Sequence, residues 1–153
     1  MQRGFTLIEL LLVIGILVIL ITATIIAVNP FRQFALANNA SRYSGTTTIM
    51  DAVYQNVVDN AGAFDCAAGT IPATAKTMGD DPTDDGTEYD ICGCIVPTYV
   101  STMPFDPQIG SYASCTDYDT DYTIARDATT GRITICATDT QIPPEAADIC
   151  VTR

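Results

Sequence analysis

The chain has 153 residues, a formal net charge of −11 and no histidine. This length allows one ordinary domain, or a small domain plus an extra segment. Without histidine the chain has no His-dependent catalytic triad, no His metal site and no haem attached through a C-x-x-C-H motif. Because an acidic chain offers no basic patch to phosphates, we do not expect direct nucleic-acid binding.

The hydrophobic residues, 48 % of the chain, are unevenly distributed. Between Phe5 and Val28 the only charged residue is Glu9. A helix over this segment would be about 36 Å long, enough to cross a hydrocarbon core of about 30 Å. Arg3 precedes the segment and the acidic part follows it. The positive-inside tendency therefore places the N-terminus in the cytoplasm and the C-terminus outside.

A cleaved secretory signal fits this segment poorly, because its apolar core is too long and the best cleavage candidate, Ile25-Ile26-Ala27, is weak. A plain uncleaved anchor is the stronger alternative, in which Glu9 would reach water near the interface. A charged residue inside a membrane helix costs about 2.5–3.5 kcal/mol on insertion scales and usually has a partner. Glu9 is therefore the residue that distinguishes a plain anchor from a membrane helix with a specific partner.

Glu9 ends the stretch Gly4-Phe5-Thr6-Leu7-Ile8-Glu9, which resembles the processing motif of type IV pilins and type II secretion pseudopilins. The resemblance implies that residues 1–4 are a leader peptide. A prepilin peptidase would cleave between Gly4 and Phe5 and methylate the new N-terminal Phe5. Glu9 would then be the fifth mature residue, the assembly residue of that family.

The chemistry of this implied assembly is simple. Cleavage creates a cationic amine at Phe5, and in an apolar bundle it can pair with the Glu9 carboxylate of a neighbouring subunit. Each charge is costly alone and tolerable when paired. Such a pair would set the axial register between subunits, as polar groups do in coiled coils. We expect the helix to be weakest at Gly15 and at Pro30, because proline removes one helical hydrogen bond.

The chain after the leader is expected to divide into three parts. Residues 5–28 are the transmembrane and filament-core helix, and residues 29–62 continue it with an apolar face that includes Met50, Val53 and Tyr54 and ends at Gly62. Residues 63–153 are an acidic, disulfide-containing, β-rich head. Its clearest element is a hairpin of residues 122–126 and 132–136.

The fold class that follows is α+β and pilin-like. A long N-terminal helix, transmembrane in its first half, packs its outer half against a small antiparallel sheet of three or four strands.

Two acidic segments in the head raise the question of calcium, which some pseudopilins bind there. The segment 69–90 is loop-like and carries Asp80, Asp81, Asp84, Asp85, Glu88 and Asp90. Its spacing matches no calcium loop and favours a solvated acidic loop. Asp117, Asp119 and Asp121 begin like an EF-hand loop but lack its glycine and glutamate, so their alternation predicts a strand with outward aspartates. We expect no cofactor, with calcium as the alternative.

The six cysteines are Cys66, Cys92, Cys94, Cys115, Cys136 and Cys150. An even number after a membrane segment favours disulfides in an oxidising compartment. Six cysteines allow 15 pairings. Cys92 and Cys94 are expected to have separate partners, because neighbours at that spacing pair poorly. A bond between Cys136 and Cys150 would resemble the C-terminal disulfide loop of many pilins.

The resemblance therefore implies a non-enzymatic structural subunit, a major pilin of a type IV pilus-like filament. Its partners would be copies of itself, the prepilin peptidase, the inner-membrane assembly machinery and the membrane. The prepilin would cross the cytoplasmic membrane once, with its N-terminus inside, before entering an extracytoplasmic or cell-surface filament. The alternatives are a secretion pseudopilin or a membrane-anchored extracytoplasmic binding domain that never polymerises. The latter predicts no cleavage after Gly4 and no dependence on Glu9.

Overall fold

The computed structural model describes residues 4–80, 86–141 and 147–153 of the chain. It divides into two compact units, Met1–Ala35 and Leu36–Arg153. The boundary between the two units, after Ala35, lies inside the predicted continuation of the helix, residues 29–62, a few residues after its start. The second unit holds the sheet, all the disulfides and the part of the second helix that packs on the sheet.

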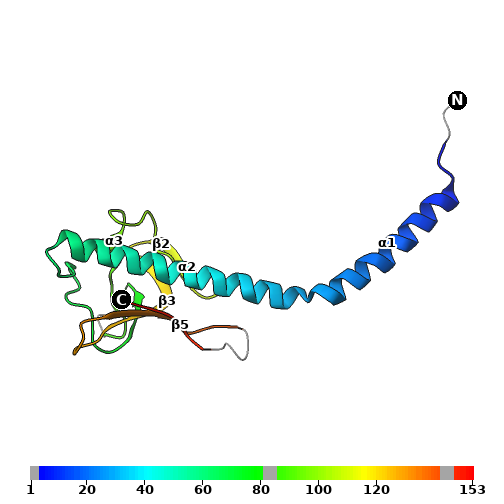
Figure 1. Ribbon diagram of the computed structural model, residues 1–153. Helices are drawn as coiled ribbons and strands as arrows, with labels where there is room; N and C mark the ends of the chain where they lie inside the picture. The colour runs from blue at the N-terminus through cyan, green and yellow to red at the C-terminus, as the bar shows by residue number, and fades with distance from the viewer. Residues whose placement is uncertain (1–3, 81–85, 142–146) are drawn as a thin grey trace. The chain divides into compact units, whose positions relative to one another are not determined.

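The first unit is dominated by helix α1, Leu7–Val28 (Figure 1). Gly15 lies inside this helix without interrupting it. The helix stops at Asn29, which adopts a left-handed conformation with φ 46°, and the chain becomes helical again at Pro30. Proline has no backbone N–H to donate, so a helix tolerates it at the first position and not in the interior. The chain therefore has a helix break at Asn29–Pro30.

Helix α2, Pro30–Asp59, crosses from the first unit into the second. It ends as the sequence predicts: Ala61 and Gly62 have positive φ values of 57° and 94°, and the Gly62 N–H donates to the Val57 carbonyl at 2.8 Å. Glycine is the usual residue for such a left-handed helix end. Gly45 lies within the continuous helix and is buried, although glycine is a poor helix former.

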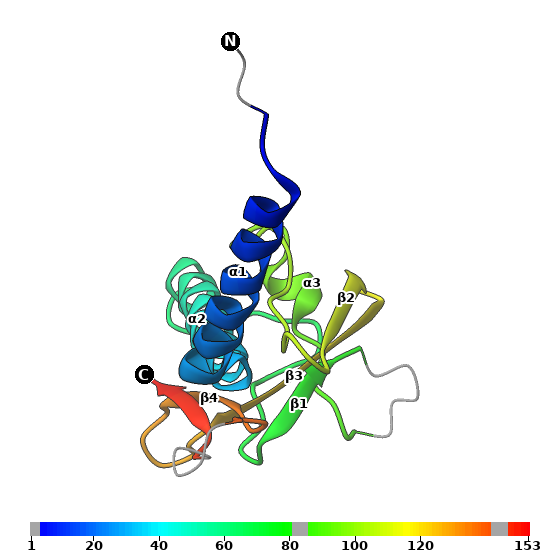
Figure 2. The same cartoon turned by 90° about the vertical axis from the view of Figure 1, so that its right-hand side faces the viewer.

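The second unit contains a five-stranded antiparallel sheet, one strand more than expected (Figure 2). Its path is β1-β3-β4-β5, and β2 pairs with the start of β3. The bounds are β1 Lys76–Gly79, β2 Ser111–Ser114, β3 Asp117–Arg126, β4 Ile133–Ala137 and β5 Ile149–Thr152, with a short helix α3, Cys92–Ile95, between β1 and β2.

The predicted hairpin is confirmed, with Arg126 of β3 opposite Ile133 of β4. The prediction of loop structure across residues 69–90 is wrong at β1, because this short strand is defined by its pairing with β3 rather than by any local pattern.

The core lies between α2 and one face of the sheet (Figure 1). Ile49 and Val53 of α2 and Tyr122 and Ile135 of the sheet are completely buried there. Along β3 buried residues alternate with more exposed ones, and Asp117, Asp119 and Asp121 fall on the more exposed positions as predicted. A helix face and a sheet face thus cover each other, which confirms the α+β fold class.

Candidate functional site

The start of α1 is fixed by a reciprocal set of hydrogen bonds between Thr6 and Glu9. Thr6 is the N-cap, with extended backbone angles of φ −84° and ψ 149°. The Glu9 N–H donates to Thr6 Oγ1 at 3.3 Å, while the Thr6 N–H and hydroxyl donate to Glu9 Oε2 at 3.0 and 2.7 Å. This is a capping box, which satisfies donors that a helix start leaves without partners. Our sequence reasoning missed it, although the T-x-x-E spacing is its ordinary signal.

The capping box has two consequences for the chemistry expected here. It gives the Glu9 carboxylate partners within its own chain, which lowers the cost of an acidic group beside a membrane segment. It also starts the helix at Leu7, so the peptide bond between Gly4 and Phe5 lies in non-helical chain. The Phe5 residue is 84 % exposed. Both residues of the bond are therefore exposed and outside the helix.

Beyond Glu9, helix α1 has no buried residue. Among the described residues it is the one helix long and apolar enough to cross a membrane. An apolar helix exposed on all sides is not stable in water, so it needs lipid or other apolar helices around it.

Residues 1–25 match the family model described as the prokaryotic N-terminal methylation motif. The chain carries the prepilin signature of type IV pilins and pseudopilins. The matched residues include Gly4, Phe5 and Glu9 and most of α1. The signature implies processing by a prepilin peptidase, and with the apolar helix it fits anchoring in a membrane. No curated protein and no solved structure gives a match to the chain.

The head that follows the signature is joined by three disulfides: Cys66–Cys94, Cys92–Cys115 and Cys136–Cys150. The neighbouring Cys92 and Cys94 thus have different partners, which connect α3 to two separate loops. The third bond connects β4 to β5, with a sequence separation of 14 residues. Disulfides of this kind stabilise small domains chiefly by restricting the unfolded chain, by about 3 kcal/mol for a loop of this length.

A buried ion pair connects α2 to the loop before β2. Arg42 Nε lies 2.5 Å from Asp106 Oδ2, and both side chains are about 1 % exposed. Arg42 also donates to Asp106 Oδ1, Asn39 Oδ1 and Gln108 Oε1 at 3.2, 3.0 and 3.2 Å. Burial alone would raise the pKa of Asp106, but the hydrogen bonds from Arg42 and Gln108 and the Arg42 charge hold that pKa below its usual value. No local sequence signal identifies a pair 64 residues apart.

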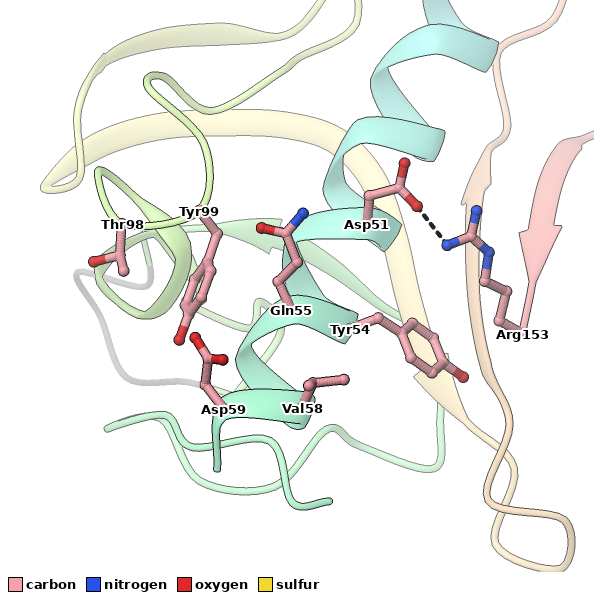
Figure 3. A pocket seen from close by; sticks show the side chains of 8 residues that line it. All are labelled: Asp51, Tyr54, Gln55, Val58, Asp59, Thr98, Tyr99 and Arg153. Atoms are coloured by element: carbon pink, nitrogen blue, oxygen red, sulfur yellow. Dashed lines mark hydrogen bonds and ion pairs between the residues drawn. The ribbon is translucent and has the colours of Figure 1, made fainter. Parts of the chain in front are cut away.

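A shallow hollow of about 590 Å³ lies along the exposed side of the last turns of α2 (Figure 3). Asp51 and Asp59 of α2 face it, with Tyr99 on one side and Arg153 on the other. Arg153 forms an ion pair with Asp51. Burial, and then the hydrogen bond and charge of Asp59, raise the pKa of Tyr99. The hollow thus brings together two carboxylates, a phenol and a guanidinium.

The acidic segment considered for calcium is only partly described, since Asp81, Asp84 and Asp85 lie outside the described residues. Asp80 Oδ1 accepts the Tyr118 N–H at 3.1 Å, and Asp90 Oδ1 accepts the Tyr118 hydroxyl at 2.7 Å. Within the ranges that the structure describes, no group of three or more acidic or cysteine side chains could hold a metal ion.

Proposed function

We propose that this protein is the structural subunit, of major-pilin type, of a type IV pilus-like filament. The proposal rests on one observation: the methylation motif coincides with an apolar helix that buries no residue within its own chain and carries a single carboxylate, Glu9. A prepilin peptidase would cleave between Gly4 and Phe5 and methylate Phe5. The helix would leave lipid for a bundle of identical helices.

Glu9 would have a different partner in each state. In the precursor the Thr6 N–H and hydroxyl bind its carboxylate. In the filament the amine of a neighbour's Phe5 would replace or join them, because an apolar bundle tolerates the two charges only as a pair. The pairing would hold each subunit at one axial position relative to the next.

One feature favours a surface pilin over a secretion pseudopilin: the head carries three disulfides. The presence of Glu9, which initiating subunits of the resembled family usually lack, favours a major subunit. Location in the cytoplasmic membrane as a single-pass precursor, and afterwards outside the cell, follows from the same proposal. A secretion pseudopilin is the second candidate, since it shares the N-terminal signature.

The first test separates the charge of Glu9 from its capping role. Glu9→Gln can keep the capping box, because glutamine serves at that position, but it removes the charge. Thr6→Ala removes the cap and keeps the charge. We expect Glu9→Gln and Glu9→Ala to insert into membranes normally and to lower the sheared filament fraction about tenfold or more, a free-energy change of about 1.4 kcal/mol.

Thr6→Ala serves as the matched control and is expected to retain more filaments than either Glu9 variant. Normal filament yield from Glu9→Gln and Glu9→Ala would contradict the assembly role of Glu9. Absence of filaments from the wild-type protein would favour a membrane-anchored domain that does not polymerise.

A further inference from the structure

One end of the head presents two apolar side chains on a tightly held loop. Phe105 and Ile109 are 41 % and 55 % exposed. Between them Asp106 is fixed by the buried pair with Arg42, and its carboxylate accepts the Gln108 N–H at 2.8 Å. We call residues 105–109 the knob. Because the backbone between the two apolar side chains is already fixed, docking them against a partner would cost little conformational entropy.

The opposite end of the head contains an apolar cavity of about 330 Å³, which we call the socket. The residues that line it come from the end of α2, the following loop and the β3–β4 hairpin, and they include Tyr54, Val57, Phe64, Thr70, Arg126 and Ile133. Arg126 is the one charged side chain in this described lining. Its Nε donates to the Gly131 carbonyl at 3.3 Å, and it forms no ion pair with any residue that the structure describes.

The knob and the socket of one molecule cannot meet each other. The knob is bound to Arg42, whereas the socket begins at Tyr54 and Val57, which follow on the same helix. Fifteen residues separate Arg42 from Val57, about 22 Å along a helix axis. Both ends lie in the same compact unit, Leu36–Arg153. A second copy displaced along the direction of α2 would bring its knob to the socket of the first.

The charges beside the two features are complementary. Asp139 lines the same surface hollow as Ile109 and Gln108, so an acid stands next to the knob. Arg126 stands at the socket and is exposed. A contact between two different surfaces of identical subunits leaves one surface of each kind free at the ends of the assembly. It therefore continues as a filament unless the rotation between subunits closes a ring.

We propose that the knob of one copy inserts Phe105 and Ile109 into the socket of the next copy, with Asp139 beside Arg126. This head-to-tail contact rests on the proposed function, because only an assembled filament would form it repeatedly. It adds a second interface, in the head, to the one that α1 would provide.

A charge exchange in the full-length protein tests the contact. Arg126→Glu and Asp139→Arg are each expected to lower the sheared filament fraction by about tenfold or less, since partly exposed charge pairs are worth about 1 kcal/mol. The double variant should recover most of the loss, because the pair is restored with its signs reversed. A double variant no better than the worse single variant would overturn the contact, as would single variants with wild-type yield.

Cross-linking gives a second readout that folding defects do not imitate. Ile109→Cys combined with Thr70→Cys should give a ladder of covalent multimers with a short bismaleimide, and either substitution alone should not. Ile109→Cys combined with Thr116→Cys, which is exposed but outside the socket, is the matched control.

Absence of the ladder in a strain whose wild-type protein forms filaments would overturn the head contact alone. Absence of wild-type filaments, with an uncleaved N-terminus, would overturn the proposed function as well.

Discussion

Asp121 is held in an unfavourable environment on β3. Its backbone is left-handed, with φ 56°, and its Oδ2 atom is buried. Burial first, and then the hydrogen bond and charge of Asp139 and the charge of Asp106, raise the pKa of Asp121 to about 6. Because the folded protein binds this proton more tightly than the unfolded chain does, Asp121 stabilises the fold only at pH values where it is protonated.

The pH dependence of stability follows from this pKa. The folded-state pKa of about 6 exceeds the ordinary value of 3.8, so the stabilisation is complete below about pH 3.8 and is lost as the pH rises through 6. Asp121→Asn keeps a residue that tolerates the left-handed region and removes the charge.

We expect Asp121→Asn to raise the free energy of unfolding of the full-length protein by about 1 kcal/mol at pH 7.5, and by less at pH 4.5. Thermal unfolding at the two pH values measures the difference. An equal gain at both would show that the charge of Asp121 is not the cause.

The Arg42–Asp106 pair permits a second prediction at the residue scale. Arg42→Met leaves a buried carboxylate without its cation, which typically costs about 3–5 kcal/mol. The double variant Arg42→Met, Asp106→Asn should recover part of that loss, because no charge then remains buried. Denaturant unfolding of the three proteins gives the comparison. A double variant less stable than Arg42→Met alone would contradict this account of the pair.

At the scale of single elements, Gly45 shows how packing overrides helix propensity. In an isolated helix alanine is better than glycine by about 1 kcal/mol. In this head a Cβ at position 45 would lie 3.0 Å from Cε2 and from the hydroxyl of Tyr122, a fully buried residue of β3. We therefore expect Gly45→Ala to lower the melting temperature of the head.

The exposed neighbour provides the control, since Ser44→Ala lies on the solvent side of the same turn and should change stability little. Stabilisation by Gly45→Ala, as propensity alone predicts, would mean that Tyr122 can move aside at little cost.

Elements with strong local signals could be predicted from the sequence, and elements defined by distant partners could not. Helix α1 follows from its uninterrupted apolar composition, and the β3–β4 hairpin from alternation and a connection that ends in Gly131. β1 was missed because Lys76–Gly79 has no alternation of its own and pairs with β3 some 40 residues later. The Arg42–Asp106 pair was missed for the same reason, because neither residue carries a local mark of burial.

The proposed processing site could be found from the sequence alone. Gly4, Phe5 and Glu9 lie within the matched methylation motif, so the sequence was enough to propose their roles. The capping box between Thr6 and Glu9 was equally visible in the spacing, and it adds a physical role for Glu9 before assembly. The knob and socket needed the structure, because they combine residues from α2, three loops and the sheet.

At the scale of the whole molecule, the chain consists of two parts that require opposite surroundings. Helix α1 needs apolar surroundings on every side, and the acidic head needs water. A single-pass precursor meets both needs in a membrane. A filament meets them again if the helices form its interior and the heads its surface.

The N-terminus of the protein isolated from sheared surface fractions tests this account most directly. Intact-mass and peptide mass spectrometry would report which residue begins the chain and whether its amine is methylated. The account predicts a chain that starts at N-methylated Phe5, with residues 1–4 removed. A chain from the same fraction that retains residues 1–4 and an unmodified Phe5 would contradict it.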